Sequence, residues 1–115
     1  EANPDMLVTN EPTMGPVVPI MIFDTIEQAV EMANATRFGF QAGAFTSSLS
    51  NAYFFSENIE SGSVYINEAT SCWDEMSPFG GVKKSGMGRM LSNWIFNELT
   101  HVKMTLFDLG KVKKG

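Results

Sequence analysis

The sequence predicts an α/β fold with a mostly parallel sheet, in the order strand, helix, strand, helix, strand. Two observations support this prediction: three short apolar or small-residue runs are typical of strands, and two helical stripes of apolar residues lie between them. This alternation favours right-handed crossover connections between parallel strands. The five elements are expected within residues 17–67, and a long loop, a helix and a terminal strand follow them.

The first strand and helix are expected after a loop over residues 1–16, which is rich in Pro, Asn and Thr. Residues 17–23 are apolar and β-branched and predict a strand, although Pro19 restricts it to an edge or a bulge. Asp24, followed by Glu27, predicts the start of a helix by a capping-box-like pattern. The buried face of this helix is predicted to comprise Ile26, Ala29, Val30 and Ala33.

The second half of the alternation begins where Phe38 and Gly39 predict the end of the first helix. Residues 42–46 predict a small-residue strand, and Ser47 or Ser48 is expected to cap the next helix. Residues 63–67 predict the third strand. The second helix is predicted to bury one side formed by Leu49, Ala52, Tyr53 and Ile59.

Beyond the alternation, residues 68–88 form a connection longer than usual, which favours a functional loop. A helix is predicted over about residues 90–100, with Leu91, Trp94, Ile95 and Leu99 on one face. Residues 101–106 alternate polar and apolar, the period of a half-buried strand, and such a strand needs a partner edge. We expect residues 1–100 to form one unit and residues 101–115 a strand with a basic tail.

Composition narrows the possible partners. The 115 residues suit one modest core, and the net charge of -5 argues against nucleic acid as the main partner. A membrane span would need an apolar run of roughly 18 to 20 residues, and the sequence has none. Cys72 is the single cysteine, which fits a reducing, cytoplasmic compartment. The chain starts at Glu1 without a targeting pattern, so we expect a fragment of a longer protein.

The glycine-rich stretch SPFGGVKKSGMGR, residues 77–89, raises the question of a phosphate site. It lacks the Gly-Lys-Ser/Thr of a P-loop, and Leu91 stands where a dinucleotide motif needs glycine. Gly86 and Gly88 could still present backbone N–H groups to an anion. A turn that needs positive φ and close backbone approach is the favoured interpretation.

Other candidate side chains carry weaker signals. Cys72 is followed by Trp73 and two acidic residues, which supply neither a base nor a positive environment for a thiolate, so a pocket-lining role is favoured. His101 is the single histidine, and one histidine with one distant cysteine cannot form a zinc site. Three glutamates in predicted loops could do acid-base work but lack an evident partner: Glu11, Glu68 and Glu75.

Five segments stand in a fixed order along the chain: EPTMGPV at 11–17, ANATRFG at 33–39, GAFT at 43–46, SGSVYIN at 61–67 and the stretch at 77–89. In these five segments taken together, the chain resembles the C-terminal part of the NAD(P)-dependent aldehyde dehydrogenase superfamily. The resemblance implies the end of the catalytic domain plus an oligomerisation strand. It implies a parent that oxidises an aldehyde to a carboxylic acid through a cysteine thiohemiacetal, with NAD or NADP as hydride acceptor.

The resemblance also implies which residues are functional. No residue here matches the nucleophilic cysteine or the general-base glutamate of the family, so no catalytic residue is assigned and the chain is expected to be inactive alone. The glutamate that contacts the cofactor ribose in the family corresponds to Pro12, which leaves Glu11 as a possible substitute. Met14 replaces the aromatic residue near the nicotinamide.

The substrate pocket is implied by the same alignment. Phe79 matches the pocket aromatic of the family. Ser71, Cys72, Trp73 and Asp74 occupy the pocket loop, whose aromatic and small residues suggest an apolar or modest-sized aldehyde. The glycines after Phe79 are then architectural, and Asn67 marks a turn after a strand. Residues 101–109 are expected to join copies into a homo-oligomer.

Two alternatives remain open at this point. The chain could be a non-catalytic interaction module in which Val102, Met104 and Leu106 form an intermolecular strand. It could also belong to a relative that uses an acylating or phosphate-dependent route. The residues that decide the second reaction step are absent from this chain, so the sequence does not separate these routes.

Overall fold

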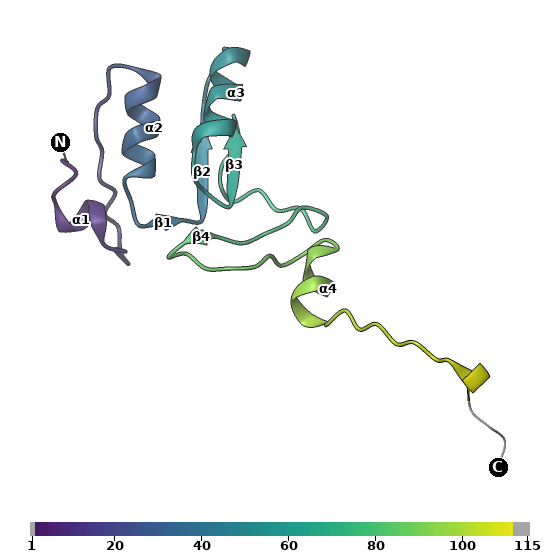
Figure 1. Ribbon diagram of the computed structural model, residues 1–115. Helices are drawn as coiled ribbons and strands as arrows, with labels where there is room; N and C mark the ends of the chain where they lie inside the picture. The colour runs from purple at the N-terminus through teal and green to yellow at the C-terminus, as the bar shows by residue number, and fades with distance from the viewer. Residues whose placement is uncertain (1, 112–115) are drawn as a thin grey trace.

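The structure is a computed structural model that describes residues 2–111 of the chain (Figure 1). In chain order the elements are α1 (Leu7–Asn10), α2 (Ile26–Asn34), β1 (Phe38–Gly39), β2 (Gln41–Ala44), α3 (Leu49–Asn58), β3 (Ser63–Ile66), β4 (Val82–Lys83), α4 (Trp94–Leu99) and the 3-10 turn η1 (Leu109–Lys111). This mixture of helices and strands confirms the α/β class.

The predicted alternation is clearest in the unit formed by β2, α3 and β3. The two strands pair in parallel, with Gln41 opposite Ser63, and α3 lies beside them (Figure 1). The N-cap of α3 is Ser48, whose Oγ accepts a hydrogen bond from the amide of Asn51 at 3.3 Å. A serine at this position satisfies an amide that the first turn of a helix leaves unpaired. The prediction of this strand, helix and strand is confirmed, with Ser48 as the cap.

The covered face of α3 matches the predicted one only in part, because Ala52 and Ile59 are half-buried. Leu49 and Tyr53 are exposed, whereas Phe55 lines a cavity together with Val30 of α2 and Gly43 of β2. Apolar residues occur on several sides of this helix, so the periodicity did not single out one face.

Asn67 extends the parallel pair by one step beyond β3. Its amide donates to the carbonyl of Ala44 at 2.8 Å. Its side-chain Oδ1 accepts from the amide of Thr46 at 2.7 Å, and its Nδ2 donates to the Thr46 carbonyl at 2.8 Å. The backbone has φ of 58°, a conformation that asparagine tolerates better than most residues. Asn67 therefore makes the turn after β3 and ties it to the end of β2.

The start of α2 lies one residue later than the sequence indicates. The cap is Thr25, whose Oγ1 accepts from the amide of Gln28 at 3.2 Å, and the Gln28 side chain accepts from the amide of Asp24 at 2.8 Å. Glutamine in the third helical position thus returns a hydrogen bond, as in a capping box. On the buried face Ala29 is half-buried and Val30 retains 7% exposure, whereas Ala33 is exposed.

The first predicted strand does not form within the described residues. Residues 17–23 carry no ladder pairing, and one backbone hydrogen bond, from the Ala2 amide to the Ile20 carbonyl at 2.9 Å, reaches this run. Pro16 and Pro19 have no amide hydrogen to donate, and a strand needs a neighbouring edge. The prediction of three parallel strands is therefore met by the pair β2 and β3 alone.

Phe38 and Gly39 do more than follow a helix, because they form β1 and pair antiparallel with β4. The first helix already ends at Asn34, where the Lys83 Nζ donates to the Asn34 carbonyl at 2.8 Å. A lysine at the C-terminal end of a helix satisfies a free carbonyl and suits the negative end of the helix dipole. The second small sheet thus anchors the glycine-rich stretch to the end of α2.

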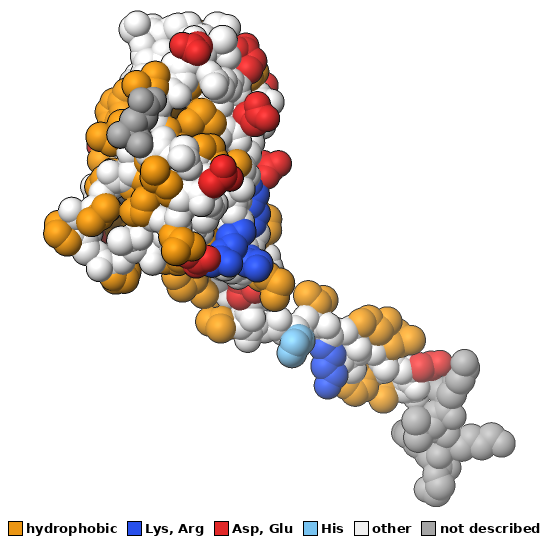
Figure 2. All heavy atoms as spheres, turned by 90° about the vertical axis from the view of Figure 1, so that its left-hand side faces the viewer, with side chains coloured by type: hydrophobic (Ala, Val, Ile, Leu, Met, Phe, Trp, Pro, Cys, Tyr) orange, Lys and Arg blue, Asp and Glu red, His pale blue; other side chains and the backbone are white. Residues whose placement is uncertain are grey.

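The C-terminal region departs most from the prediction. α4 begins at Trp94, because Leu91 and Ser92 have φ of 63° and 51° and cannot continue a right-handed helix. Residues 101–108 have no helix or strand in the described chain, and residues 101–109 leave the body as an extended arm (Figure 1). Figure 2 shows hydrophobic side chains along this arm. Lys113 and Lys114 of the expected basic tail lie outside the described residues.

The dimensions of the chain show how little surface it hides from solvent. Its radius of gyration is 21.7 Å, against roughly 13 Å for a compact domain of this length. Its accessible surface is 9390 Å², against roughly 6,200 Å² for a folded monomer of this mass. Val30 is the one apolar side chain classed as buried in the described residues. Most apolar faces of this chain therefore need further protein to cover them.

Candidate functional site

An aromatic cavity of about 250 Å³ lies between β3 and the loop that follows it. Its lining includes Tyr65, Cys72, Trp73, Phe79 and Leu91. We call it the aromatic cavity. The structure therefore brings Cys72, Trp73 and Phe79 together as predicted, whereas Ser71 is not among the lining residues.

Phe79 is the centre of the aromatic wall. Its ring packs edge-to-face on Phe40 at a centroid distance of 5.1 Å and lies tilted against Trp73 at 5.2 Å. Such ring pairs stabilise beyond the area that they bury. The Phe79 amide donates to the Met90 carbonyl at 2.9 Å, and the Met90 amide donates back at 2.7 Å. The ring is therefore fixed on one side by aromatic packing and on the other by a two-bond bridge.

Tyr65 joins the strand pair to the pocket loop. Its hydroxyl accepts from Gln41 Nε2 at 3.1 Å and donates to the Cys72 carbonyl at 3.4 Å. The tyrosine projects from β3 on the same face as Ser63, because side chains alternate along a strand. The loop is held over the strands by this contact, and the exposed Cys72 is positioned by its backbone.

Asp74 organises the rim of the cavity. Its Oδ1 accepts from the Met76 amide at 3.0 Å, and its Oδ2 accepts from the Ser77 hydroxyl. These hydrogen bonds, from Ser77 first and then Met76, lower the pKa of Asp74 from its ordinary value of 3.8. The carboxylate therefore carries a full negative charge at neutral pH beside Trp73 and Phe79.

The glycines of residues 77–89 permit close backbone contact around the site. A Cβ atom at Gly62 would lie 1.6 Å from the carbonyl oxygen of Gly80, and one at Gly81 would lie 2.6 Å from Ser85 Cβ. Arg89 donates to the Gly81 carbonyl at 2.9 Å. Arg89 and Lys83 thus bind backbone carbonyls, and Lys83 also pairs with the Glu60 carboxylate at 2.8 Å, so the stretch acts as a packed turn in this structure.

Glu11 and Met14 lie apart from the aromatic cavity and are not among its lining residues. The Glu11 carboxylate pairs through Oε2 with Arg37, whose guanidinium lies 5.0 Å from the ring centroid of Phe38. Half of the Glu11 side chain remains exposed, and Met14 is 98% exposed. The ion pair holds the carboxylate in place without enclosing it.

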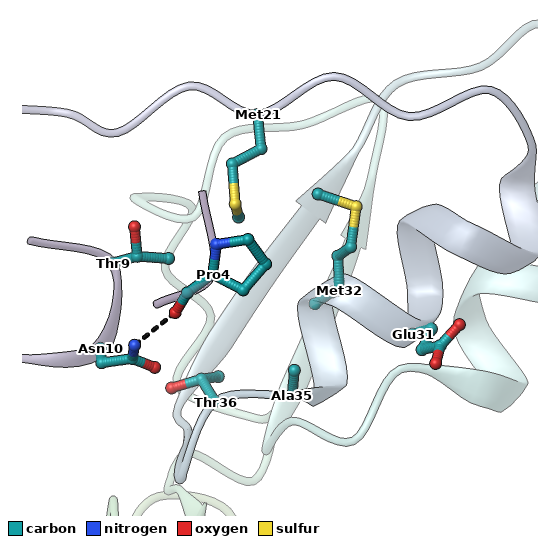
Figure 3. Close-up of a pocket in the computed structure, with 9 residues that line it drawn as sticks. Pro4, Thr9, Asn10, Met21, Glu31, Met32, Ala35 and Thr36 are labelled. Carbon is teal, nitrogen blue, oxygen red and sulfur yellow. Dashed lines mark hydrogen bonds between the residues drawn. The ribbon is translucent and has the colours of Figure 1, made fainter. Parts of the chain in front are cut away.

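A second cavity, of about 420 Å³, separates the N-terminal segment from α2 (Figure 3). Figure 3 shows Met21 and Met32 facing it from opposite sides, with the Asn10 side-chain amide donating to the Pro4 carbonyl. Glu31 is the one ionisable residue in its lining. A single carboxylate among apolar side chains offers no pair for acid-base chemistry.

The described residues also limit the other kinds of site. No three His, Cys, Asp or Glu side chains in residues 2–111 come together where a metal could bind. Among the same residues, no helix has both the length and the apolar character needed to cross a membrane.

Comparison with known proteins identifies the family. The model of the aldehyde dehydrogenase family matches residues 1–105, which is most of the chain. The chain belongs to the aldehyde dehydrogenase family. This aldehyde dehydrogenase chain spans about a fifth of the length of the curated relatives it matches, since it covers 22% of one and 21% of another.

The relatives show how closely the chain follows the family. It is 42% identical over 93% of its length to a succinate semialdehyde dehydrogenase of Acinetobacter baylyi, and 38% identical over 96% to human retinaldehyde dehydrogenase 3. Among solved structures, an NAD-dependent aldehyde dehydrogenase from Sinorhizobium meliloti matches with a TM-score of 0.88 and 34% identity. That match covers 98% of this chain and 22% of the other.

A second solved structure includes a bound cofactor. It is an indole-3-acetaldehyde dehydrogenase of P. syringae in complex with NAD+, with a TM-score of 0.86 and 38% identity. The match covers 90% of this aldehyde dehydrogenase chain and 21% of the other.

Sequence reasoning placed Asp74 in the pocket loop but did not assign five other lining residues of the aromatic cavity: Ser63, Tyr65, Ser77, Pro78 and Leu91. Tyr65 could have been found from the strand alternation, which places it on the face of Ser63. Ser77 follows Asp74 by three residues, a spacing that permits a side-chain turn. Leu91 had no such signal, because the apolar period assigned it to a helix face.

Proposed function

We propose that this chain forms the C-terminal fifth of an NAD(P)-dependent aldehyde dehydrogenase and supplies one wall of its aldehyde pocket. The observation that carries the proposal is the aromatic cavity, in which Phe79 and Trp73 pack at a centroid distance of 5.2 Å within a chain of this family. Substrate pockets are mostly apolar, with a few placed polar groups. The whole protein oxidises an aldehyde to a carboxylic acid.

The cavity favours a neutral, apolar aldehyde of modest size. Its aromatic wall can pack against a ring or a short alkyl chain. The ionised Asp74 at the rim disfavours a substrate that carries its own carboxylate, because like charges repel. We therefore expect benzaldehyde to be preferred over succinate semialdehyde.

The chain's own residues bind and orient, whereas bond making needs other parts of the protein. Phe79 and Trp73 hold the substrate and exclude water on one side. Cys72 is exposed and is followed closely by the acidic Asp74 and Glu75, so we do not assign it as the nucleophile. We expect the chain alone to be inactive, because the thiohemiacetal requires a cysteine and base from the rest of the enzyme.

Glu11 and Met14 are placed where each could make one contact with the cofactor. Arg37 fixes one carboxylate oxygen, and the half-exposed side chain leaves the other free to accept a hydrogen bond from a ribose hydroxyl. Met14 is exposed and can cover an apolar ring edge. NAD or NADP, when bound, supplies the hydride acceptor of the oxidation. Glu11 and Met14 are accordingly proposed as its contacts from this chain.

We also propose that the arm, residues 101–109, joins copies of the protein into a homo-oligomer. Val102, Met104 and Leu106 are exposed on an extended backbone, and an unpaired extended segment can add to the edge of a sheet in another chain. The proposed location is the cytoplasm, since the exposed thiol of Cys72 suits a reducing compartment.

The test is the rate of NAD(P) reduction by the whole protein with benzaldehyde and with succinate semialdehyde. Replacing Phe79 with alanine should lower kcat/KM for benzaldehyde about 10- to 100-fold, because it removes a pocket wall. The matched control is Phe96→Ala, which removes an exposed ring on α4 and should leave kcat/KM within about twofold. The proposal would be contradicted if the whole protein failed to reduce NAD(P) with any aldehyde tested.

One observation also favours the second candidate, a non-catalytic interaction module. The apolar side chains of the arm are exposed, and they could bind another chain even if the protein had no active site. In that case the protein would assemble through residues 101–109 and show no aldehyde-dependent reduction of NAD(P), with Phe79→Ala leaving its assembly unchanged.

A further inference from the structure

Leu91 is held in a backbone conformation that leucine seldom adopts. Its φ is 63° and that of the next residue, Ser92, is 51°, so two consecutive residues that are not glycine lie in the left-handed region. In that region the Cβ atom crowds the backbone, which is why glycine and asparagine are favoured there. Strain of this kind persists only where surrounding contacts impose it, and it often marks functional sites.

Three backbone hydrogen bonds impose this conformation. Before Leu91, Met90 exchanges two bonds with Phe79, at 2.7 and 2.9 Å. After it, the Ser92 amide donates to the Glu75 carbonyl at 3.0 Å. Both neighbours of Leu91 are thus bound to the loop that carries Trp73 and Phe79, and the intervening residue has little freedom.

The consequence is the position of the side chain. Leu91 is half-buried and lines the aromatic cavity together with the strand residue Tyr65, rather than lying on the face of a helix. α4 begins three residues later, at Trp94. The strained turn therefore directs a branched apolar group into a space of about 250 Å³ that already contains two aromatic walls.

We infer that Leu91 limits the size of the aldehyde that this pocket accepts. The inference rests on the proposed function. In a cavity this small, a leucine side chain occupies room that an additional ring or branch of the substrate would need. Because leucine is uncharged, Leu91 selects by volume, while the rim carboxylate of Asp74 acts on charge. Leu91 is thus a specificity-determining residue and takes no part in bond making.

Three variants of the whole protein separate side-chain volume from backbone strain. Leu91→Ala removes most of the side chain and keeps a Cβ atom in the left-handed region. Leu91→Gly removes the side chain and also relieves the strain. Ser92→Gly relieves strain at the neighbouring position and leaves the lining of the aromatic cavity intact, so it is the matched control.

The measurement is the ratio of kcat/KM for 2-naphthaldehyde to kcat/KM for propanal. Both Leu91 variants should raise this ratio about tenfold, since one or two substrate carbons in an apolar pocket discriminate by about that factor. Ser92→Gly should raise the melting temperature and leave the ratio within about twofold. An unchanged ratio in Leu91→Ala, or an equal rise in Ser92→Gly, would overturn the inference.

A binding measurement keeps this inference separate from the proposed function. If the wild-type protein oxidises no aldehyde, the proposed function fails, and the binding of 2-naphthol, measured by isothermal titration calorimetry, then decides the role of Leu91. Tighter 2-naphthol binding by about tenfold in Leu91→Ala, with phenol binding unchanged, supports the size limit. Equal binding of 2-naphthol by the two proteins would contradict it.

Discussion

Two regions of this chain both carry apolar side chains but have very different surroundings. The central region, residues 38–92, ties itself together through the parallel pair β2 and β3, the antiparallel pair β1 and β4, and the bridge between Phe79 and Met90. The arm, residues 101–109, presents Val102, Met104 and Leu106 to solvent. The first region positions its cavity by contacts within the chain. The second has the sequence of a strand without a neighbouring edge in the described residues.

The difference shows what an apolar pattern specifies. A period of two indicates which side chains share a face, but a ladder also needs backbone partners. Residues 41–44 find theirs in residues 63–66, across a single helix. Residues 101–106 would have to find theirs outside the chain. The four predictions that follow test this division between internal and external support.

The largest expected effect is the loss of a close backbone contact in the central region. Gly62→Ala would place a Cβ atom 1.6 Å from the Gly80 carbonyl oxygen, so the two segments must separate. We expect a loss of about 3 kcal/mol in the free energy of unfolding, measured by urea denaturation.

The matched control for this change lies beyond the arm. At Gly110 a Cβ atom would meet only an Asp108 carboxylate oxygen, at 3.5 Å. Gly110→Ala should change the free energy of unfolding by less than about 0.5 kcal/mol. Equal losses in Gly62→Ala and Gly110→Ala would remove the distinction between the two regions.

Asn67 should show the next largest effect, because it combines a left-handed backbone with a side-chain link to Thr46. Asn67→Ala loses two hydrogen bonds and adds strain, and we expect it to cost about 2 kcal/mol. Asn67→Gly adopts the left-handed backbone conformation without strain, and it should lower the free energy of unfolding by about 1 kcal/mol. Thermal unfolding in the same buffer measures both, and a glycine variant less stable than the alanine variant would refute this role.

In the arm, the expected effect is on assembly rather than on folding. Met104→Asp places a charge on the apolar face and should raise the dissociation constant of the oligomer about tenfold or more, which corresponds to about 1.4 kcal/mol. Thr105→Asp adds the same charge to the opposite face and should change it less than about threefold. Sedimentation at several concentrations measures both, and equal shifts would argue against a strand-like interface.

The smallest effect concerns pH. The hydrogen bonds from Ser77 and the Met76 amide lower the pKa of Asp74 in the folded chain, so its ionised form stabilises the loop at pH values above its ordinary value of 3.8. This contribution is lost as the pH falls through the lowered pKa. Asp74→Asn should therefore be slightly less stable than wild type at pH 7, with the gap closing below pH 3.8. A gap that persists in acid would assign the effect to something other than the charge.

Local signals in the sequence were sufficient for the elements that complete themselves nearby. Ser48 as a helix cap, the parallel strands on either side of α3 and the joint position of Cys72, Trp73 and Phe79 were all predictable from spacing, caps and family motifs. Each of these depends on contacts over short stretches or on a motif with fixed spacing.

The sequence was insufficient where distant backbone contacts override local preference. Leu91 fits a helical stripe, but its neighbours are bound to Phe79 and Glu75, so the turn is left-handed. Residues 17–23 and 101–106 fit strands, yet the described chain offers them no edge. Periodicity carries no information on whether a partner is present.

Amide hydrogen exchange of the whole protein, above and below the concentration at which its oligomer dissociates, would test the division between the two regions most directly. We predict that amides in residues 102–107 lose protection on dissociation, whereas those of Phe79, Met90 and Ser92 keep theirs. This prediction would be contradicted if the arm stayed protected in the monomer, or if the amides around the aromatic cavity lost protection together with it.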